Sequence, residues 1–187
     1  VLPAVDKQKA IEIVELGIRE NPNEWRLYQH LGYIHWRLKN FEKASEVYET
    51  GSKIAESPAF MKMMAAQMKT KGGSPETARE MYEQMLAEAD DSKTKEIAEL
   101  RLLELDSFAE RQAIQDALDS FKSRNGRCPG AFAEIFPLLK TVKLPKGKDF
   151  RIDRSNNIVD PTDAPYLLNS QTCQVTLDSK NTKIPLQ

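Results

Sequence analysis

Few residues in this sequence have the chemistry to bind a metal or to act as a nucleophile. The chain of 187 residues contains two histidines, His30 and His35, and two cysteines, Cys128 and Cys173. A helix turns by about 100° per residue, so side chains five positions apart differ by about 140° in direction and cannot share a metal ion. The cysteines lack the spacing of a zinc site. We expect no metal site, and packing or surface roles for both histidines.

Catalytic motifs are missing as well. The sequence has no nucleophile elbow, phosphate-binding loop, dinucleotide fingerprint or zinc-protease motif. The segment 71–74 (Lys-Gly-Gly-Ser) is similar to a phosphate loop only superficially, because a helical pattern rather than a strand precedes it. Acidic residues gather at helix starts and on helix surfaces, where they complement the helix dipole and face water. We therefore expect no catalytic residues and no cofactor, and a protein that is not an enzyme.

Composition narrows the classes of partner. Hydrophobic residues make up 40% of the chain and charged residues 29%, and the formal net charge is −1. This balance gives no reason to expect nucleic-acid binding. No apolar run reaches the roughly 18 residues of a membrane span, so we expect no insertion within this chain. The basic stretch 140–154 could dock an acidic partner, an anionic membrane or nucleic acid, but a solvated loop is the favoured interpretation.

An internal repeat is the strongest signal about the elements that must position any site. Shifting the sequence by 34 residues aligns small residues with small ones and bulky ones with bulky ones. The aligned sets are Ala10, Ala44 and Ala78, and Val14, Tyr48 and Tyr82. Small residues let two antiparallel helices approach closely, and bulky ones fill the space between successive hairpins. One hairpin cannot bury its own apolar face, so the hairpins must stack.

The central unit carries a recognisable motif. It reads Tyr28-x-x-Leu31-Gly32-x-x-His35, followed by Ala44-x-x-x-Tyr48, Gly51 and Pro58. This pattern resembles the tetratricopeptide repeat, strongly over 25–58, well over 59–92 and partially elsewhere. The resemblance implies a mainly α solenoid of antiparallel helical hairpins, here over residues 1–124. It also implies a non-enzymatic adaptor that binds a peptide or protein in its concave groove.

The resemblance further indicates which residues line that groove. The first helix of each repeat supplies them, which gives a surface of aromatic, methionine and basic side chains. Such side chains serve as interface anchors, although Trp36, Met63 and Met64 could instead pack against neighbouring elements. The predicted groove residues are Arg26, Gln29, His30, Tyr33, Trp36, Arg37, Phe60, Met63, Met64, Gln67, Lys71 and Arg101.

Residues 125–187 have a different character and form a predicted small α+β module. Breaker residues at 125–130 precede a short amphipathic helix at about 131–140, and short hairpin signals follow at 150–159 and 166–177. The segments Gly126-Arg127-x-Pro129 and Asp160-Pro161-x-x-x-Pro165-Tyr166 resemble the C-terminal region of type II secretion pseudopilins. This resemblance implies a bacterial protein. Cys128 and Cys173 either pair in an oxidising compartment or remain two buried thiols.

The first helix, at about 6–20, matches the second helix of a repeat whose first helix is missing. The sequence therefore either begins within a repeat or lies downstream of further repeats or an anchor. The uncovered apolar edge predicts a homodimer through this incomplete repeat. An alternative function is a structural or assembly domain of a bacterial envelope apparatus that uses the C-terminal module for contacts. Both a cytoplasmic and a tethered periplasmic location fit the sequence.

Overall fold

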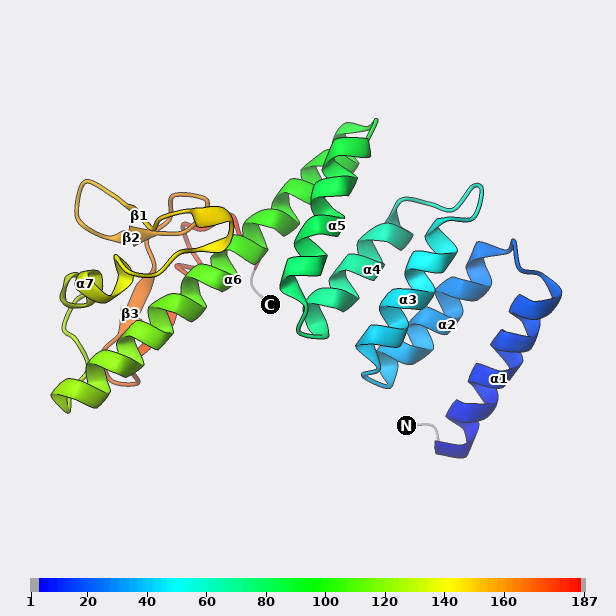
Figure 1. Ribbon diagram of the computed structural model, residues 1–187, viewed down its shortest axis with the longest axis horizontal. Helices are drawn as coiled ribbons and strands as arrows, with labels where there is room; N and C mark the ends of the chain where they lie inside the picture. The colour runs from blue at the N-terminus through cyan, green and yellow to red at the C-terminus, as the bar shows by residue number, and fades with distance from the viewer. Residues whose placement is uncertain (1–3, 186–187) are drawn as a thin grey trace. The chain divides into compact units, whose positions relative to one another are not determined.

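The computed structural model describes residues 4–185, with side chains from Lys7 onward. The chain divides into two compact units, one ending at Glu99 and the other beginning at Leu100. The first unit is a row of antiparallel helices in which α1 packs on α2, α2 on α3, α3 on α4 and α4 on α5 (Figure 1). These helices span Ala4–Glu20 (α1), Trp25–Arg37 (α2), Phe41–Ser52 (α3), Phe60–Lys71 (α4) and Pro75–Glu88 (α5). The row confirms the mainly α, helical-hairpin architecture.

Close approach of helices depends on the small residues of the repeat. A Cβ atom added to Gly32 in α2 would lie 2.8 Å from the ring of Tyr48 in α3. A Cβ atom on Gly51 would lie 2.6 Å from the Cβ of Tyr28. Ala44 in α3 and Ala78 in α5 are fully buried. Each small residue therefore admits a large neighbour, as the 34-residue register predicts.

The core of the first unit joins the second helix of one hairpin to the first helix of the next. Its fully buried members lie on α3 and α4, and aromatic side chains from α2 and from the starts of α3 and α4 cover them. The hydroxyl of Ser45 donates a hydrogen bond of 2.9 Å to the carbonyl oxygen of Ala65, which ties α3 to α4. The buried members are Ala44, Tyr48, Met61, Ala65 and Met68.

One continuous helix, α6 (Ser92–Asn125), runs from the first unit into the second. The helix is continuous across Ser107, whose side chain is fully buried and lies with its Oγ 3.1 Å from the Tyr166 hydroxyl. The boundary between the compact units thus falls within α6, whereas a domain boundary at 124/125 stays a prediction.

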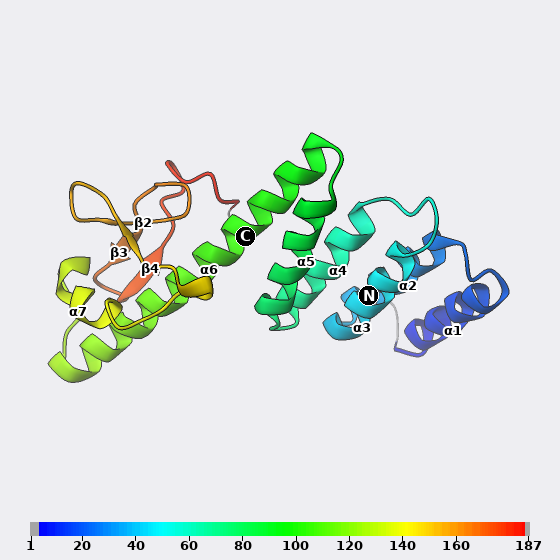
Figure 2. The same ribbon diagram turned by 45° about the horizontal axis from the view of Figure 1, so that its top comes forward.

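The second unit wraps short elements around the later part of α6 (Figure 2). They are the single-turn helices η1 (Phe132–Ile135), α7 (Phe136–Leu139) and η2 (Pro145–Gly147), and four short strands. Strands β1 (Arg151–Ile152) and β2 (Ile158–Val159) form one antiparallel hairpin, and β3 (Leu167–Asn169) and β4 (Gln174–Thr176) form another. These hairpins lie where the sequence predicts them. Pro137 stands in the first turn of α7, so the predicted helix at 131–140 is split into two short turns.

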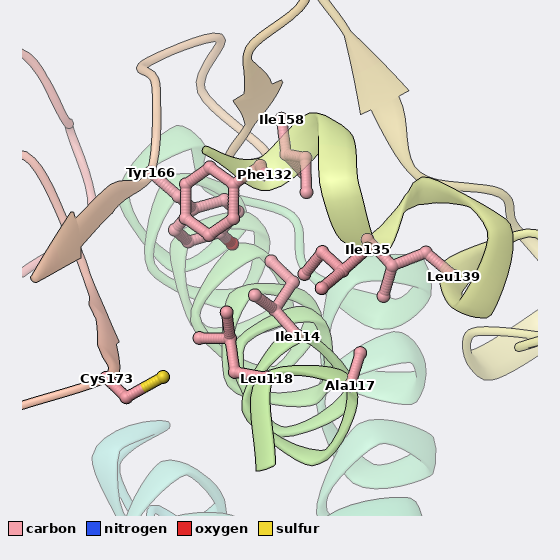
Figure 3. Close-up of a cluster of buried hydrophobic side chains, with 9 residues drawn as sticks. All are labelled: Ile114, Ala117, Leu118, Phe132, Ile135, Leu139, Ile158, Tyr166 and Cys173. Carbon is pink, nitrogen blue, oxygen red and sulfur yellow. The ribbon is translucent and has the colours of Figure 1, made fainter. Parts of the chain in front are cut away.

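A hydrophobic core holds this second unit together. Figure 3 shows α6 side chains, including Ile114 and Leu118, pointing toward residues of η1 and β2. The side-chain amide of Gln115 also fastens β4 to α6, donating to the carbonyl oxygen of Cys173 at 2.9 Å and accepting from the Val175 amide at 3.2 Å. The core comprises Ile114, Ala117, Leu118, Phe132, Ile135, Leu139, Ile158, Tyr166 and Cys173.

Cys128 and Cys173 form a disulfide within the second unit, with their Cα atoms 5.5 Å apart. The bond joins the segment after α6 to the residue before β4, so it closes a loop 45 residues long. Of the two alternatives that the sequence leaves open, the structure has the paired form.

Candidate protein-binding surface

Four of the predicted groove residues form one exposed stripe on α2. Arg26, His30, Tyr33 and Arg37 recur at spacings of four, three and four, which places them within about 60° of one another around the helix. All four side chains are exposed, and Tyr33 keeps 49% of its surface accessible to water. We call these residues the α2 stripe. It combines one accessible aromatic ring with two guanidinium groups and an imidazole.

The other two predicted residues of α2 flank the stripe. The Trp36 ring lies 5.4 Å from the Tyr33 ring between centroids, and it also packs against the core of the first unit. Trp36 and Gln29 are half-buried. Trp36 therefore packs within the fold with part of its surface, and the rest remains accessible beside Tyr33.

Most predicted residues of α4 are also half-buried. Phe60 and Met64 pack against the core, and the Phe60 ring meets the Trp25 ring edge-on, with centroids 6.0 Å apart. Met63 and Gln67 are half-buried, and Lys71 is exposed at the end of the helix. On α4, then, Lys71 alone among the predicted residues is exposed.

Arg101 belongs to the second unit, in contrast with the rest of the predicted groove. It lies on α6, where its guanidinium pairs with the Glu104 carboxylate one turn along at 2.7 Å. Whether Arg101 takes part in one surface with α2 and α4 stays a prediction.

An open hollow of about 460 Å³ lies on a different side of α2. Tyr28 and Leu31 of α2 line it and lie across the helix from the α2 stripe. Charged side chains from α1 and α3 line it further. Sequence reasoning missed this hollow, because its residues occupy packing positions of the repeat rather than positions of known ligand contact. The lining residues are Glu15, Ile18, Arg19, Tyr28, Leu31, Glu46, Val47 and Thr50.

The two histidines have different surroundings. His30 is exposed in the α2 stripe, whereas His35 is 6% exposed and its Nδ1 atom has no hydrogen-bond partner among the described residues. Burial lowers the pKa of His35, and the nearby Lys43 lowers it further. His35 therefore stays neutral in the folded protein at neutral pH and acts as a packing residue.

The second unit contains one buried polar cluster. The Tyr166 hydroxyl lies 2.7 Å from Oε2 of Glu110 and 3.1 Å from Oγ of Ser107, and all three residues are buried. Burial raises the pKa of Glu110 to about 7, partly offset by its hydrogen bond from Tyr166 and by Arg151. The same burial raises the pKa of Tyr166, which therefore remains protonated. This cluster joins α6 to Tyr166, the residue before β3, through a contact between segments far apart in the sequence.

The basic stretch 140–154 is partly neutralised by nearby acids. Three of its six cations form ion pairs of 2.7 Å, which reduces the local charge excess that a partner would meet. The pairs are Lys143 with Asp149, Lys148 with Asp106, and Arg151 with Asp163. This arrangement agrees with the favoured interpretation of a solvated loop.

Two further features of the described residues bear on function. Between residues 4 and 185, no group of three or more His, Cys, Asp or Glu side chains is arranged to hold a metal ion. Across the same residues, no helix is both long and apolar enough to cross a membrane.

The stacked hairpins place this chain in the class of helical-repeat proteins. Within that class, the family model of the tetratricopeptide repeat matches residues 26–58, which contain most of α2 and all of α3. The match confirms the resemblance seen in the motif around Gly32 and indicates a role in protein–protein interaction. A comparison with curated proteins gave no match. The pseudopilin resemblance of the C-terminal part stays a prediction.

Proposed function

We propose that this protein is a non-enzymatic scaffold that binds a peptide or protein along the α2 stripe and the neighbouring surface of α4. The observation that carries the proposal is the exposure of four predicted contact residues in one stripe of a tetratricopeptide repeat. Aromatic and arginine side chains dominate the binding energy of many interfaces, because they combine a large apolar surface with directed hydrogen bonds. The repeat family is generally non-catalytic, which agrees with this assignment.

The most direct test is selection of peptides from a displayed random library against the full chain. Binding of the selected peptides is then measured for wild type and for the double variant Tyr33→Ala/Arg37→Ala. Removing one aromatic and one guanidinium anchor is expected to weaken binding by at least about tenfold, since each hot-spot residue contributes on the order of 1–2 kcal/mol.

A matched control separates the stripe from the hollow across α2. The double variant Glu46→Ala/Thr50→Ala alters the hollow and leaves the stripe intact. Peptides bound by the stripe should retain wild-type affinity for this control. Unchanged affinity for a folded Tyr33→Ala/Arg37→Ala protein would exclude the stripe as the binding surface.

The disulfide favours a second candidate function. Structural disulfides persist in oxidising compartments such as the bacterial periplasm. A structural or assembly domain of an envelope apparatus, making contacts through the C-terminal module, would work in such a compartment. Cysteine alkylation of the protein in its native cells tests this idea: protected Cys128 and Cys173 support it, and two reactive thiols contradict it.

A further inference from the structure

Helix α1 has apolar side chains on two opposite faces. One face carries Ile11, which is buried, and packs toward α2, where Gly17 approaches Leu27. The other face carries Ile13 and Leu16, which are 69% and 51% exposed. These two residues are among the most exposed large hydrophobic side chains of the described chain, and α1 lies at the end of the helical row (Figures 1 and 2).

Charged residues bracket this exposed pair symmetrically. Lys9 and Glu20 are both exposed and lie on the same face of α1 as Ile13 and Leu16, within about 60° around the helix. Lys9 precedes Ile13 by four residues, and Glu20 follows Leu16 by four. The midpoint between Ile13 and Leu16 is therefore also the midpoint between Lys9 and Glu20. We call these four residues the α1 stripe.

We propose that the α1 stripe binds the α1 stripe of a second copy of this chain, with the two helices antiparallel about a two-fold axis. In such a contact each residue meets the one equally far from the midpoint. Ile13 then packs beside Leu16 of the second copy, and Lys9 meets Glu20 of the second copy. Both ends of the contact gain an ion pair of opposite charges, and the centre is apolar.

Self-complementarity is the reason for choosing a second copy as the occupant. An unrelated helix or peptide could bind through the apolar pair alone. Binding of such a partner does not require a cation and an anion at equal distances from the centre of the stripe. A parallel arrangement of two copies would bring Lys9 toward Lys9 and Glu20 toward Glu20. The charge pattern therefore specifies both the partner and the antiparallel direction.

The expected association is weak and reversible. One pair of helices buries less than the roughly 1,200–2,000 Å² of a stable protein interface. Sedimentation equilibrium of the full chain, from about 10 μM to about 1 mM, should show a concentration-dependent monomer–dimer equilibrium. A chain that remains monomeric across this range overturns the proposal.

Charge reversal tests the arrangement without disturbing the fold, because the side chains are exposed. Lys9→Glu and Glu20→Lys each replace two symmetry-related attractions by repulsions and should weaken dimerisation by about tenfold. The double variant Lys9→Glu/Glu20→Lys restores opposite charges and should recover affinity to within about threefold of wild type. Failure of the double variant to recover, while circular dichroism shows it folded, overturns the antiparallel pairing.

Two further variants test the apolar centre. Ile13→Glu places a charge there and should abolish the dimer. Leu167→Glu is the matched control, because Leu167 is 45% exposed on β3 in the other unit. A dimer that survives Ile13→Glu, or that is lost in Leu167→Glu, would place the interface elsewhere and overturn the proposal.

Discussion

Glu110 is a buried acid whose ionisation opposes folding of the second unit. Its carboxyl is buried beside Tyr166 and Ser107, and the charges of Arg151, Asp106 and Asp160 also act on its pKa. Burial raises the pKa of Glu110 from an ordinary 4.5 to about 7. Because folding favours the protonated acid, this group stabilises the fold fully below pH 4.5. That stabilisation is lost as the pH rises through about 7.

We predict that Glu110→Gln removes this loss, since a neutral amide can still accept the Tyr166 hydrogen bond. The variant should unfold at about the same urea concentration as wild type near pH 4.5, and be more stable by up to about 3 kcal/mol at pH 8. Urea unfolding, monitored by hydrogen exchange of the amides in residues 100–185, measures this difference in stability between the variant and wild type. Asp116→Asn, at an exposed carboxylate on α6, is the matched control variant. A pH-independent difference between wild type and Glu110→Gln would contradict the assignment.

At the scale of elements, two glycines with the same helical setting should respond in opposite directions to alanine. A Cβ atom at Gly51 in α3 would lie 2.6 Å from the Tyr28 Cβ and from the Met61 methyl group, whereas one at Gly17 in α1 would lie 3.4 Å from Leu27. Overpacking costs about 1–3 kcal/mol, and the helix propensity of alanine returns about 1 kcal/mol. Gly51→Ala should therefore destabilise the first unit, and Gly17→Ala should leave it unchanged or more stable.

Thermal unfolding monitored by tryptophan fluorescence checks this pair, because Trp25 and Trp36 both report on the first unit. Equal effects of the two substitutions would show that helix propensity, rather than close packing of hairpins, decides the cost.

The elements were predictable to the extent that local pattern determines them. The 34-residue register of small and bulky residues identified the hairpins, because Gly32 and Gly51 are required where two helices touch. Glu24 is the N-cap of α2, since its carboxylate accepts the hydrogen bond from the Arg26 amide, although the preceding Asn23 is of a type more common at that position. A pattern of residue types cannot distinguish such near-equivalent caps.

Features that depend on long-range packing were not predictable in the same way. The contact between Glu110 and Tyr166 spans 56 residues, and the Gln115 amide reaches β4 across about the same separation. The hollow between α1 and α3 depends on how these helices pack, which residue types alone do not give. Exposure of the α2 stripe was predictable because a repeat position and a helix face specify it together.

At the scale of the whole molecule, the two compact units share one helix, α6. The Cys128–Cys173 disulfide constrains only the second unit, where it closes a 45-residue loop. Loop-closure entropy predicts that such a crosslink stabilises the fold by about 2–4 kcal/mol. Reduction of the disulfide should therefore destabilise the second unit and leave the stability of the first unit almost unchanged.

We predict that a Cys128→Ser/Cys173→Ser variant unfolds in two separate steps. Hydrogen exchange in residues 100–185 should show loss of protection at lower urea concentration than in wild type, because the loop closed by the disulfide gains freedom in the unfolded state. The tryptophan transition of the first unit should stay within about 0.5 kcal/mol of wild type, because the substituted residues make no contribution to its core. Wild type treated with a reductant should behave like the variant, which separates loss of the crosslink from any effect of the serines. If the tryptophan transition instead moves together with the exchange of the second unit, the shared helix α6 couples the two units into one cooperative structure.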